Sequence, residues 1–321
     1  MGKLIAKRLV LLVPVLLAAS MLTFLMVSLL PGCVECEILG PDNITPEAIA
    51  AVRADLGLDQ PLPLRYLHWL GNALTGDLGQ SYRTDQGVTE ALLERLPVTL
   101  EIVVVSMLLS LAIAIPLGVL SAHRAGSRLD RGITGTTFGL LSIPSFMMAL
   151  LLIYIFAVEL RWFPATGWTS FQDDPVKNLR SVFMPALALS TASVAVFTRL
   201  LRTDMITTLQ EDHVLLARSK GLTTRKILFR YALRPSSLSL ITIAGITLGN
   251  LLGGALIVEQ LFALPGMGRL MVDSIFQRDL LIVQGGVLLI TTGFVLANFA
   301  VDILYAVLDP RIRQGNARAQ R

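Results

Sequence analysis

Long apolar runs separated by polar segments dominate the pattern of this chain. Six runs contain no Asp, Glu, Lys, Arg or His, and each reaches at least 18 residues. That length crosses roughly 30 Å of hydrocarbon as a helix, and helices are expected because lipid cannot satisfy backbone polar groups. The pattern predicts an all-α polytopic membrane protein with six transmembrane helices, over residues 9–30, 102–122, 132–158, 181–198, 235–258 and 280–301.

The first run also has features of a secretory signal peptide, since Lys3, Lys7 and Arg8 precede its apolar core. However, a run of about 22 residues is long for the apolar region of a signal peptide. The sequence Pro31-Gly32-Cys33 is also a poor small-residue cleavage site. Both features favour a helix that is retained in the mature protein.

Composition and charge agree with a membrane protein and predict its orientation. Hydrophobic residues make up 54% of the chain and charged residues 16%, against about 25% charged in soluble domains. With six spans both termini lie on one side, which then carries 18 of the 27 Lys and Arg residues. The positive-inside rule predicts that this side is cytoplasmic. This orientation explains the basic pI, so nucleic-acid binding is not needed to account for it.

The polar segments suggest how the chain is organised. Residues 31–97 form a long extracytoplasmic segment, in which Thr45-Pro46-Glu47 predicts a helix start and further short helices are expected near 64–74 and 89–96. This small cap could pack over the helix ends or meet an external partner. The predicted divisions are an N-terminal span at 1–30, the helical outer segment at 31–97, a core at 98–310 with a cytoplasmic loop at about 199–235, and a tail at 311–321.

Cys33 and Cys36 are the only cysteines, and they are spaced C-x-x-C just outside the first span. Outside the cytoplasm a local disulfide is plausible. A zinc site would need two further ligands, which no nearby histidine supplies. A disulfide or two unreactive thiols is therefore preferred to redox chemistry.

The cytoplasmic loop has the pattern of a helix, a turn and a second helix. Thr207–Lys220 favours a helix that ends at Gly221, and Thr223 can begin the next one. A short helix held between two spans suits docking into a groove of a cytoplasmic protein. An amphipathic helix lying on anionic lipid is the alternative.

Catalytic and proton-relay motifs are missing from the sequence. There is no Walker A motif, no H-E-x-x-H and no G-x-S-x-G, and His68, His123 and His213 all fall in polar loops. No ionisable residue is expected deep within a span, and Glu259 and Asp302 are expected near solvated span ends. We therefore expect no catalytic residue, metal or cofactor in this chain, and an energy source in another subunit.

Glycines repeat at four-residue spacing in the fifth run, at Gly245, Gly249 and Gly253, next to Asn250. This spacing allows close packing of two helices, which is the preferred interpretation. The alternative is that the same small residues and Asn250 line a path for a polar solute. Pro116, Pro144 and Pro185 could kink the second, third and fourth spans.

Several segments resemble the permease subunits of bacterial ABC importers of the dipeptide and oligopeptide family, which also includes nickel and glutathione permeases. The stretch DHVLLARSKGL at 212–222, continuing to YALR at 231–234, resembles the family's cytoplasmic coupling motif. It has Leu215-Leu216-Ala217 where the general motif begins Glu-Ala-Ala. The resemblance extends, in the family's order, to 56–61, 76–79, EQLFALPGMGRL at 259–270 and DILYAVLDPRIR at 302–313.

The resemblance implies a type I ABC importer permease fold. It also implies a complex with a second, similar permease, two cytoplasmic ATPases that bind ATP and Mg, and an extracytoplasmic solute-binding protein. The helix around 211–221 would be the coupling helix, and 265–269 would belong to an outer loop that could contact the binding protein. The residues implied for coupling are Glu211, Asp212, Ala217, Arg218, Lys220 and Gly221, and those for outer contact are Pro265, Gly266, Gly268 and Arg269.

The function expected from the sequence is the translocation pathway of an importer for di- or oligopeptides. Nickel, glutathione or another small solute is the alternative within the same class. A secondary carrier without ATPase partners is the alternative from another class, as is a scaffold that uses the cytoplasmic helix as a dock.

Overall fold

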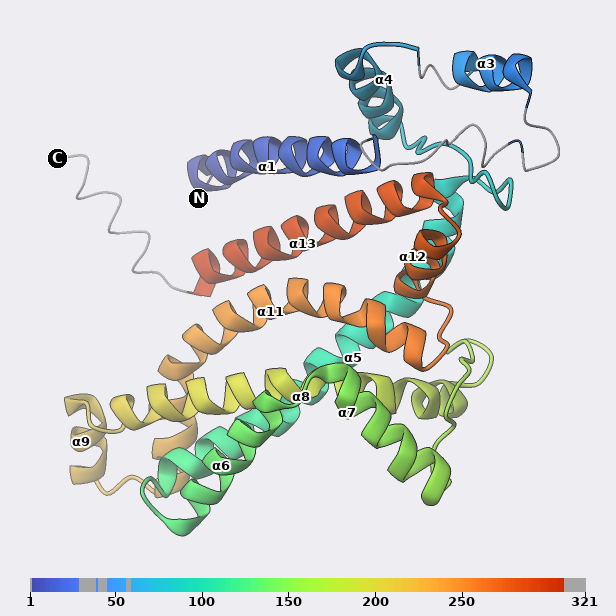
Figure 1. Cartoon of the computed structure of the whole chain (residues 1–321). Coiled ribbons are helices and arrows are strands. Elements are labelled where there is room, and N and C mark those ends of the chain that lie inside the picture. The colour runs from blue at the N-terminus through green and yellow to red at the C-terminus, as the bar shows by residue number, and fades with distance from the viewer. Residues whose placement is uncertain (1, 29–38, 40–44, 56–58, 309–321) are drawn as a thin grey trace.

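The computed structural model describes the backbone of residues 2–28, 39, 45–55 and 59–308 (Figure 1). Within these ranges the chain is helical, apart from turns, loops and one isolated bridge between Gln80 and Gly87. The all-α prediction is therefore confirmed. The described helices are α1 Gly2–Ser28, α3 Pro46–Asp55, α4 Leu62–Leu74, α5 Val88–His123, α6 Arg128–Ser142, α7 Ser145–Leu152, the π-helix η1 Ile153–Glu159, α8 Pro175–Thr208, α9 Asp212–Ser219, α10 Thr224–Lys226, the π-helix η2 Ile227–Ala232, α11 Leu233–Leu261, α12 Met267–Phe276 and α13 Leu280–Leu308.

The described residues of the predicted apolar runs are helical, apart from Ile143 and Pro144 in the third run. Among the described helices, α5, α8, α11 with the residues leading into it, and α13 are long and apolar enough to cross a membrane. The bent pair of α6 with α7–η1 supplies a fifth span if it is counted as one. In α1 the described apolar stretch is Leu12–Met26.

The third run bends sharply at Pro144, one of the prolines expected to kink a span. The chain bends by 102° between α6 and the helix that begins at Ser145. Ile143 is extended, with φ −95° and ψ 118°, and Pro144 is the N-cap of α7. A residue before proline is sterically driven out of the helical region, and this explains the break.

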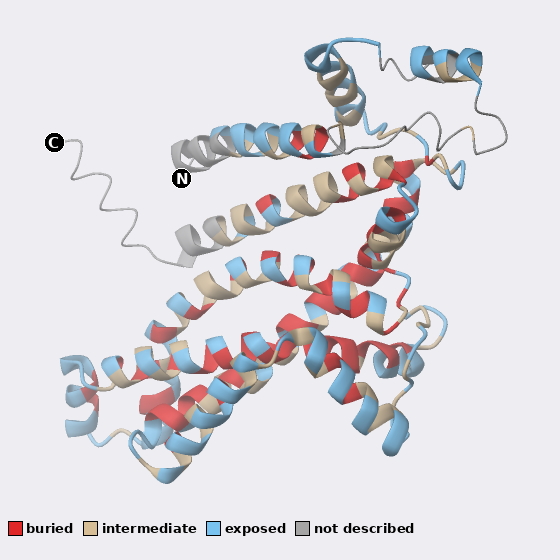
Figure 2. Ribbon diagram, in the orientation of Figure 1, coloured by how far each residue is buried: buried red, intermediate tan, exposed pale blue. Residues whose placement is uncertain are grey.

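Helix α8 lies at the centre of the bundle and crosses α5 closely (Figure 2). Small residues let the two backbones approach: Ser106 Oγ donates to the Ala186 carbonyl at 3.1 Å, and Gly118 faces Leu201. Pro185 lies inside α8, which is continuous across it. The side chains of α8 are consequently the most buried of the candidate spans.

A cap of short helices and loops covers one end of the bundle. Thr45 Oγ1 accepts from the Ala48 N–H at 3.1 Å, which confirms the predicted start of α3. Helix α4 confirms the second short helix, and its Tyr66 bonds Ser20 of α1. The third short helix predicted at 89–96 is not separate, because α5 continues through Pro97 without a break.

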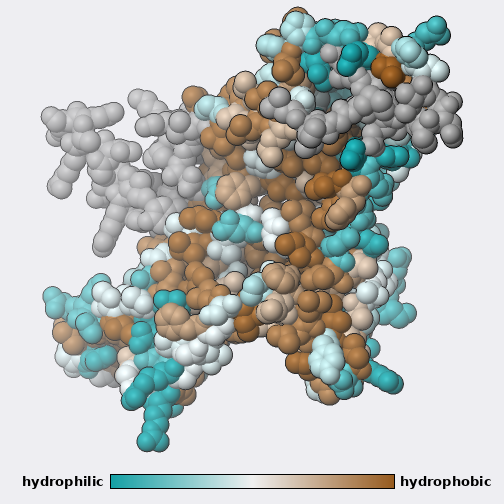
Figure 3. Space-filling model, in the orientation of Figure 1, coloured by the Kyte–Doolittle hydropathy of each residue, from teal (hydrophilic) through white to brown (hydrophobic). Residues whose placement is uncertain are grey.

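The functional elements lie at opposite ends of the molecule. Helix α9 protrudes at one end, where α1 begins and α13 ends, whereas α3, α4 and α12 lie at the other (Figure 1). Apolar side chains cover the helical middle, and hydrophilic ones gather toward both ends (Figure 3). This distribution is the one expected of a bundle that spans a bilayer.

Candidate functional site

Helix α9, the predicted coupling helix, is a short surface helix fixed by two buried side chains. Val214 and Ala217 are almost completely buried and pack against Ile227 of η2. The neighbouring Leu215 and Leu216 are 51% and 56% exposed and face away from this cluster. The result is a firmly seated helix that presents leucines outward.

Helix α9 begins later than the sequence predicted, but it ends at the predicted glycine stop. The helix was expected from Thr207, but α8 continues to Thr208 and α9 begins only at Asp212. Lys220 is the C-cap, and Gly221 follows with φ +72°, the left-handed conformation of a helix stop. Thr223 stands at the start of the next helix, although its side chain caps no backbone N–H there.

The N-terminal end of α9 is tied to η2 through a histidine. His213 Nδ1 lies 3.1 Å from Glu211 Oε2, and His213 Nε2 lies 3.2 Å from the Tyr231 carbonyl oxygen. The chain runs directly from η2 into α11. Side-chain packing and this polar contact therefore connect α9 to the segment that continues into α11.

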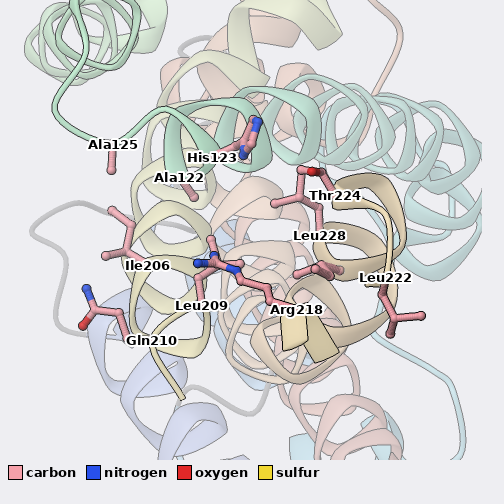
Figure 4. Close-up of a pocket in the computed structure, with 11 residues that line it drawn as sticks. Ala122, His123, Ala125, Ile206, Leu209, Gln210, Arg218, Leu222, Thr224 and Leu228 are labelled. Atoms are coloured by element: carbon pink, nitrogen blue, oxygen red, sulfur yellow. The ribbon is translucent and has the colours of Figure 1, made fainter. Parts of the chain in front are cut away.

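Arg218 and Lys220, which the sequence could not separate, occupy different environments. A cavity of about 540 Å³ lies between α9 and the ends of α5 and α8, and Arg218 lines it (Figure 4). Both side chains are exposed, but Lys220 does not line the cavity. Only Arg218 therefore faces the space behind the helix.

An ion pair between a buried aspartate and a partly buried arginine joins the helices on the same side, and sequence reasoning missed it. Arg202 of α8 binds Asp130 of α6 in a bidentate manner, with Nε–Oδ1 at 2.6 Å and Nη2–Oδ2 at 2.8 Å. Ser121 of α5 and the Gly126 N–H also donate to this carboxylate. Asp130 is 2% exposed. The only local signal was Ser127, which caps α6 by accepting from the Asp130 N–H.

The repeated glycines of α11 do not all serve one role. A Cβ added at Gly245 or Gly249 would lie within 3.0 Å of Val301 or Phe294 of α13, a separation that real Cβ atoms essentially never show. At Gly253 nothing lies within 4 Å, and Asn250 is also exposed. The first two glycines pack helices together, whereas Asn250 and Gly253 belong to an open face.

The predicted outer contact segment is partly interior. Pro265 is exposed and Arg269 is half-exposed, but Gly266 and Gly268 are buried against Glu259. Glu259 is fully buried rather than solvated, which corrects the expectation for this residue. Its carboxylate accepts from Thr99 Oγ1 at 2.6 Å and from the Gly268 N–H at 2.7 Å.

Glu259 thereby links three helices at the outer end. It lies on α11, Thr99 lies on α5, and the Gly268 N–H belongs to the first turn of α12, where a negative charge is favourable. The Met267 N–H donates to Thr99 Oγ1 at 2.9 Å. These partners are distant in sequence, so local patterns could not reveal them.

Two predicted features involve residues outside the described part of the chain. Cys33 and Cys36 lie outside the described residues, and so does the side chain of Asp302. Among the residues that are described, no group of three His, Cys, Asp or Glu side chains is placed to hold a metal ion. The disulfide therefore stays a prediction.

Comparison with known proteins agrees with this architecture. Two structures of the inward-facing MetNI methionine ABC transporter resemble the chain with TM-scores of 0.52 and 0.56, at 19% and 18% identity. The matches cover 66% and 68% of this chain and 93% and 96% of the other chains. At such identity the likeness shows the fold alone.

Sequence relatives extend over nearly the whole chain. The oligopeptide transport system permease protein of Bacillus subtilis is 38% identical over 97% of this chain and 99% of that protein. The di/tripeptide permease protein of Pseudomonas aeruginosa and the dipeptide permease protein of Escherichia coli are each 36% identical, over 96% of this chain and 98% of each protein.

Two family descriptions cover most of the sequence. Residues 1–103 match the N-terminal part of binding-protein-dependent transport system membrane components. Residues 114–314 match the family described as binding-protein-dependent transport system inner membrane component. The chain therefore belongs to the family of binding-protein-dependent transport system inner membrane components, a multi-pass permease with the fold expected from its sequence.

Proposed function

We propose that this permease forms part of the translocation pathway of an ATP-driven importer for di- or oligopeptides. The observation that carries the proposal is α9, a seated surface helix that turns two leucines outward at the end of the bundle. The names of the relatives support a peptide as the solute. Both termini would be cytoplasmic, on the side of α9.

The partners would be a second permease of the same kind, two ATPase subunits and an extracytoplasmic solute-binding protein. ATP and Mg would bind to the ATPase subunits and supply the energy of transport. Leu215 and Leu216 would insert into a groove of one ATPase, as an amphipathic helix does in a hydrophobic groove. The chain itself would take no catalytic part.

Coupling would proceed as a shift between two conformations. A ligand that binds one conformation more tightly displaces the equilibrium toward it, and ATP would do so through the ATPases. Movement of α9 would reach α11 through His213 and the packing of Val214 on η2. The Arg202–Asp130 pair would keep α8 and α6 moving together.

The open face of α11 would meet the second permease or line the pathway. Its exposed residues recur at helical spacing and include Ile246, Asn250, Gly253 and Ile257. A peptide carries polar backbone groups that need partners when they leave water. Asn250 would provide such a partner, and Gly253 would leave room beside it. At the outer end, Pro265 and Arg269 would contact the binding protein.

The first test is a pull-down of the tagged full-length chain, combined with uptake of labelled dipeptide. Leu215→Asp with Leu216→Asp should abolish recovery of the ATPases and uptake while the chain still inserts into the membrane. Leu67→Asp is the matched control, because Leu67 is 59% exposed on α4 at the opposite end. Normal ATPase recovery with the double variant would refute the proposed dock.

The same preparation separates the alternatives. Recovery of the ATPases together with uptake of nickel or glutathione, but not of peptides, would refute the peptide as solute and keep the coupling role. Uptake without any ATPase partner would indicate a secondary carrier.

A further inference from the structure

The cavity behind α9 combines a polar and an apolar lining (Figure 4). We propose that it binds the phosphate headgroup region of an anionic phospholipid from the surrounding leaflet. This inference rests on the proposed orientation, in which α9 lies at the cytoplasmic face. The lining residues are Ala122, His123, Ala125, Ile206, Leu209, Gln210, Arg218, Leu222, Thr224, Ile227 and Leu228.

The polar part of the lining favours an anion. Arg218 is the permanent charge in it, and no Asp or Glu lines the cavity. Within the part of the chain that is described, the side chains of Arg218, His123, Gln210 and Thr224 have no hydrogen-bond or ion-pair partner. A guanidinium matches the geometry of a phosphate with two parallel hydrogen bonds. The site therefore offers free donors to a phosphate group.

The apolar part of the lining favours a lipid over a free ion. Ile206, Leu209 and Leu222 would contribute nothing to an inorganic phosphate, but they can contact the methylene groups near a glycerol backbone. The volume of about 540 Å³ is also far larger than the roughly 30 Å³ share of one water molecule. A lone phosphate would leave most of this space unfilled.

The position of the cavity places it at headgroup level. Helix α5 ends at His123 and helix α8 ends at Thr208, and the cavity lies at these ends. Helix ends of a spanning bundle lie near the boundary between hydrocarbon and water. Anionic lipids on the cytoplasmic side attract nearby basic residues.

A bound lipid would brace the coupling helix from behind. Arg218 extends from α9 toward the side chains at the end of α8, whereas Leu215 and Leu216 face outward (Figure 4). The lipid would fill the space into which α9 could otherwise tilt. The composition of the membrane would thus influence how firmly ATPase movement is passed to the permease.

The test is native mass spectrometry of the full-length chain, purified with the subunits that remain bound to it, in equal parts phosphatidylglycerol and phosphatidylcholine. The wild-type chain should retain phosphatidylglycerol preferentially. Arg218→Gln should reduce this retention roughly tenfold, the size expected for losing hydrogen bonds between charged groups. Lys220→Gln is the matched control and should retain the lipid, because Lys220 does not line the cavity.

Other results would overturn the proposal. If Arg218→Gln and Lys220→Gln lose phosphatidylglycerol retention equally, the lipid is attracted by a diffuse basic surface and not by the cavity. Displacement of phosphatidylglycerol by an equal concentration of inorganic phosphate would identify a soluble anion as the ligand. His123→Gln provides a second variant and should also weaken retention. Recovery of ATPase subunits is scored in the same sample, so a failure of the proposed function is recognised separately.

Discussion

Replacing Gly249 by alanine should destabilise the permease, although the same change at Gly253 should not. A methyl group at Gly249 would lie within 3.0 Å of the Phe294 ring, whereas nothing lies within 4 Å of one at Gly253. Carbon atoms normally rest about 3.5–4.0 Å apart, so Phe294 or all of α13 must move by on the order of 1 Å. The two variants differ only in this neighbour.

The expected change in unfolding free energy is the balance of two opposing contributions. Overpacking in a tight interior costs about 1–3 kcal/mol, and an off-rotamer aromatic side chain contributes to that cost. Replacing a helical glycine by alanine stabilises a helix by up to about 1 kcal/mol. Gly249→Ala should therefore lose about 1–2 kcal/mol of unfolding free energy, whereas Gly253→Ala should be neutral or slightly stabilising.

The assay is thermal unfolding of the purified variants in one detergent, with dipeptide uptake measured in parallel. Phe294→Ala should restore part of the stability lost by Gly249→Ala, because it removes the clashing ring, and a double-mutant cycle measures this coupling. Equal melting temperatures for Gly249→Ala and Gly253→Ala would refute the packing argument. Reduced uptake of a stable Gly253→Ala variant would support a pathway role for the open face.

Three further predictions concern polar contacts and the turn after α9. Arg202→Gln should lower the melting temperature, because removing one partner of the buried pair leaves Asp130 with too few donors, at a cost of about 3 kcal/mol. Gly221→Asp should leave membrane insertion intact but reduce uptake, since the positive φ costs about 1–2 kcal/mol and the new charge would face the ATPase. Thr99→Val should cost about 1–3 kcal/mol in a thermal melt, because it leaves Glu259 without its hydroxyl donor.

Each of these variants has a matched comparison. Arg199→Gln removes a cation–π contact with Phe138 instead of a buried ion pair, and should have the smaller effect. Gly221→Asn reproduces the shape of aspartate without its charge, so equal uptake defects would attribute the effect to the backbone alone. Thr242→Val removes a hydroxyl that bonds only its own helix, and an equal loss there would argue against a special role for Thr99.

The apolar runs and the helix start and stop signals were enough to predict the membrane class, most of the helices and the position of α9. Composition alone could not place the start of α9, because the residues after 198 continue α8 as readily as they begin a new helix. Pro144 and Pro185 carry the same kink signal in the sequence, yet the chain bends sharply at Pro144 whereas α8 is continuous across Pro185.

The polar contacts could not be predicted because their partners are far apart along the chain. Arg202 was expected in the cytoplasmic loop at about 199–235, and nothing nearby in the sequence marks it as the partner of Asp130. Glu259 was expected in water because it ends an apolar run. Glu259 is buried because the chain folds back after α11, so that the first turn of α12 brings backbone N–H donors to the carboxylate.

The glycines of α11 show why equal spacing does not mean equal roles. In an α-helix a step of four residues advances about 40° around the axis, so Gly245 and Gly253 lie about 80° apart. This rotation carries the glycines from the face that packs on α13 to the open face that includes Asn250. Helix α11 thus packs tightly on α13 through Gly245 and Gly249 and also contacts α8, whereas the face that includes Asn250 and Gly253 is exposed. Movement received from α9 through η2 would therefore shift α11 and α13 as a pair and change the open face, which is the arrangement required if that face borders a solute path.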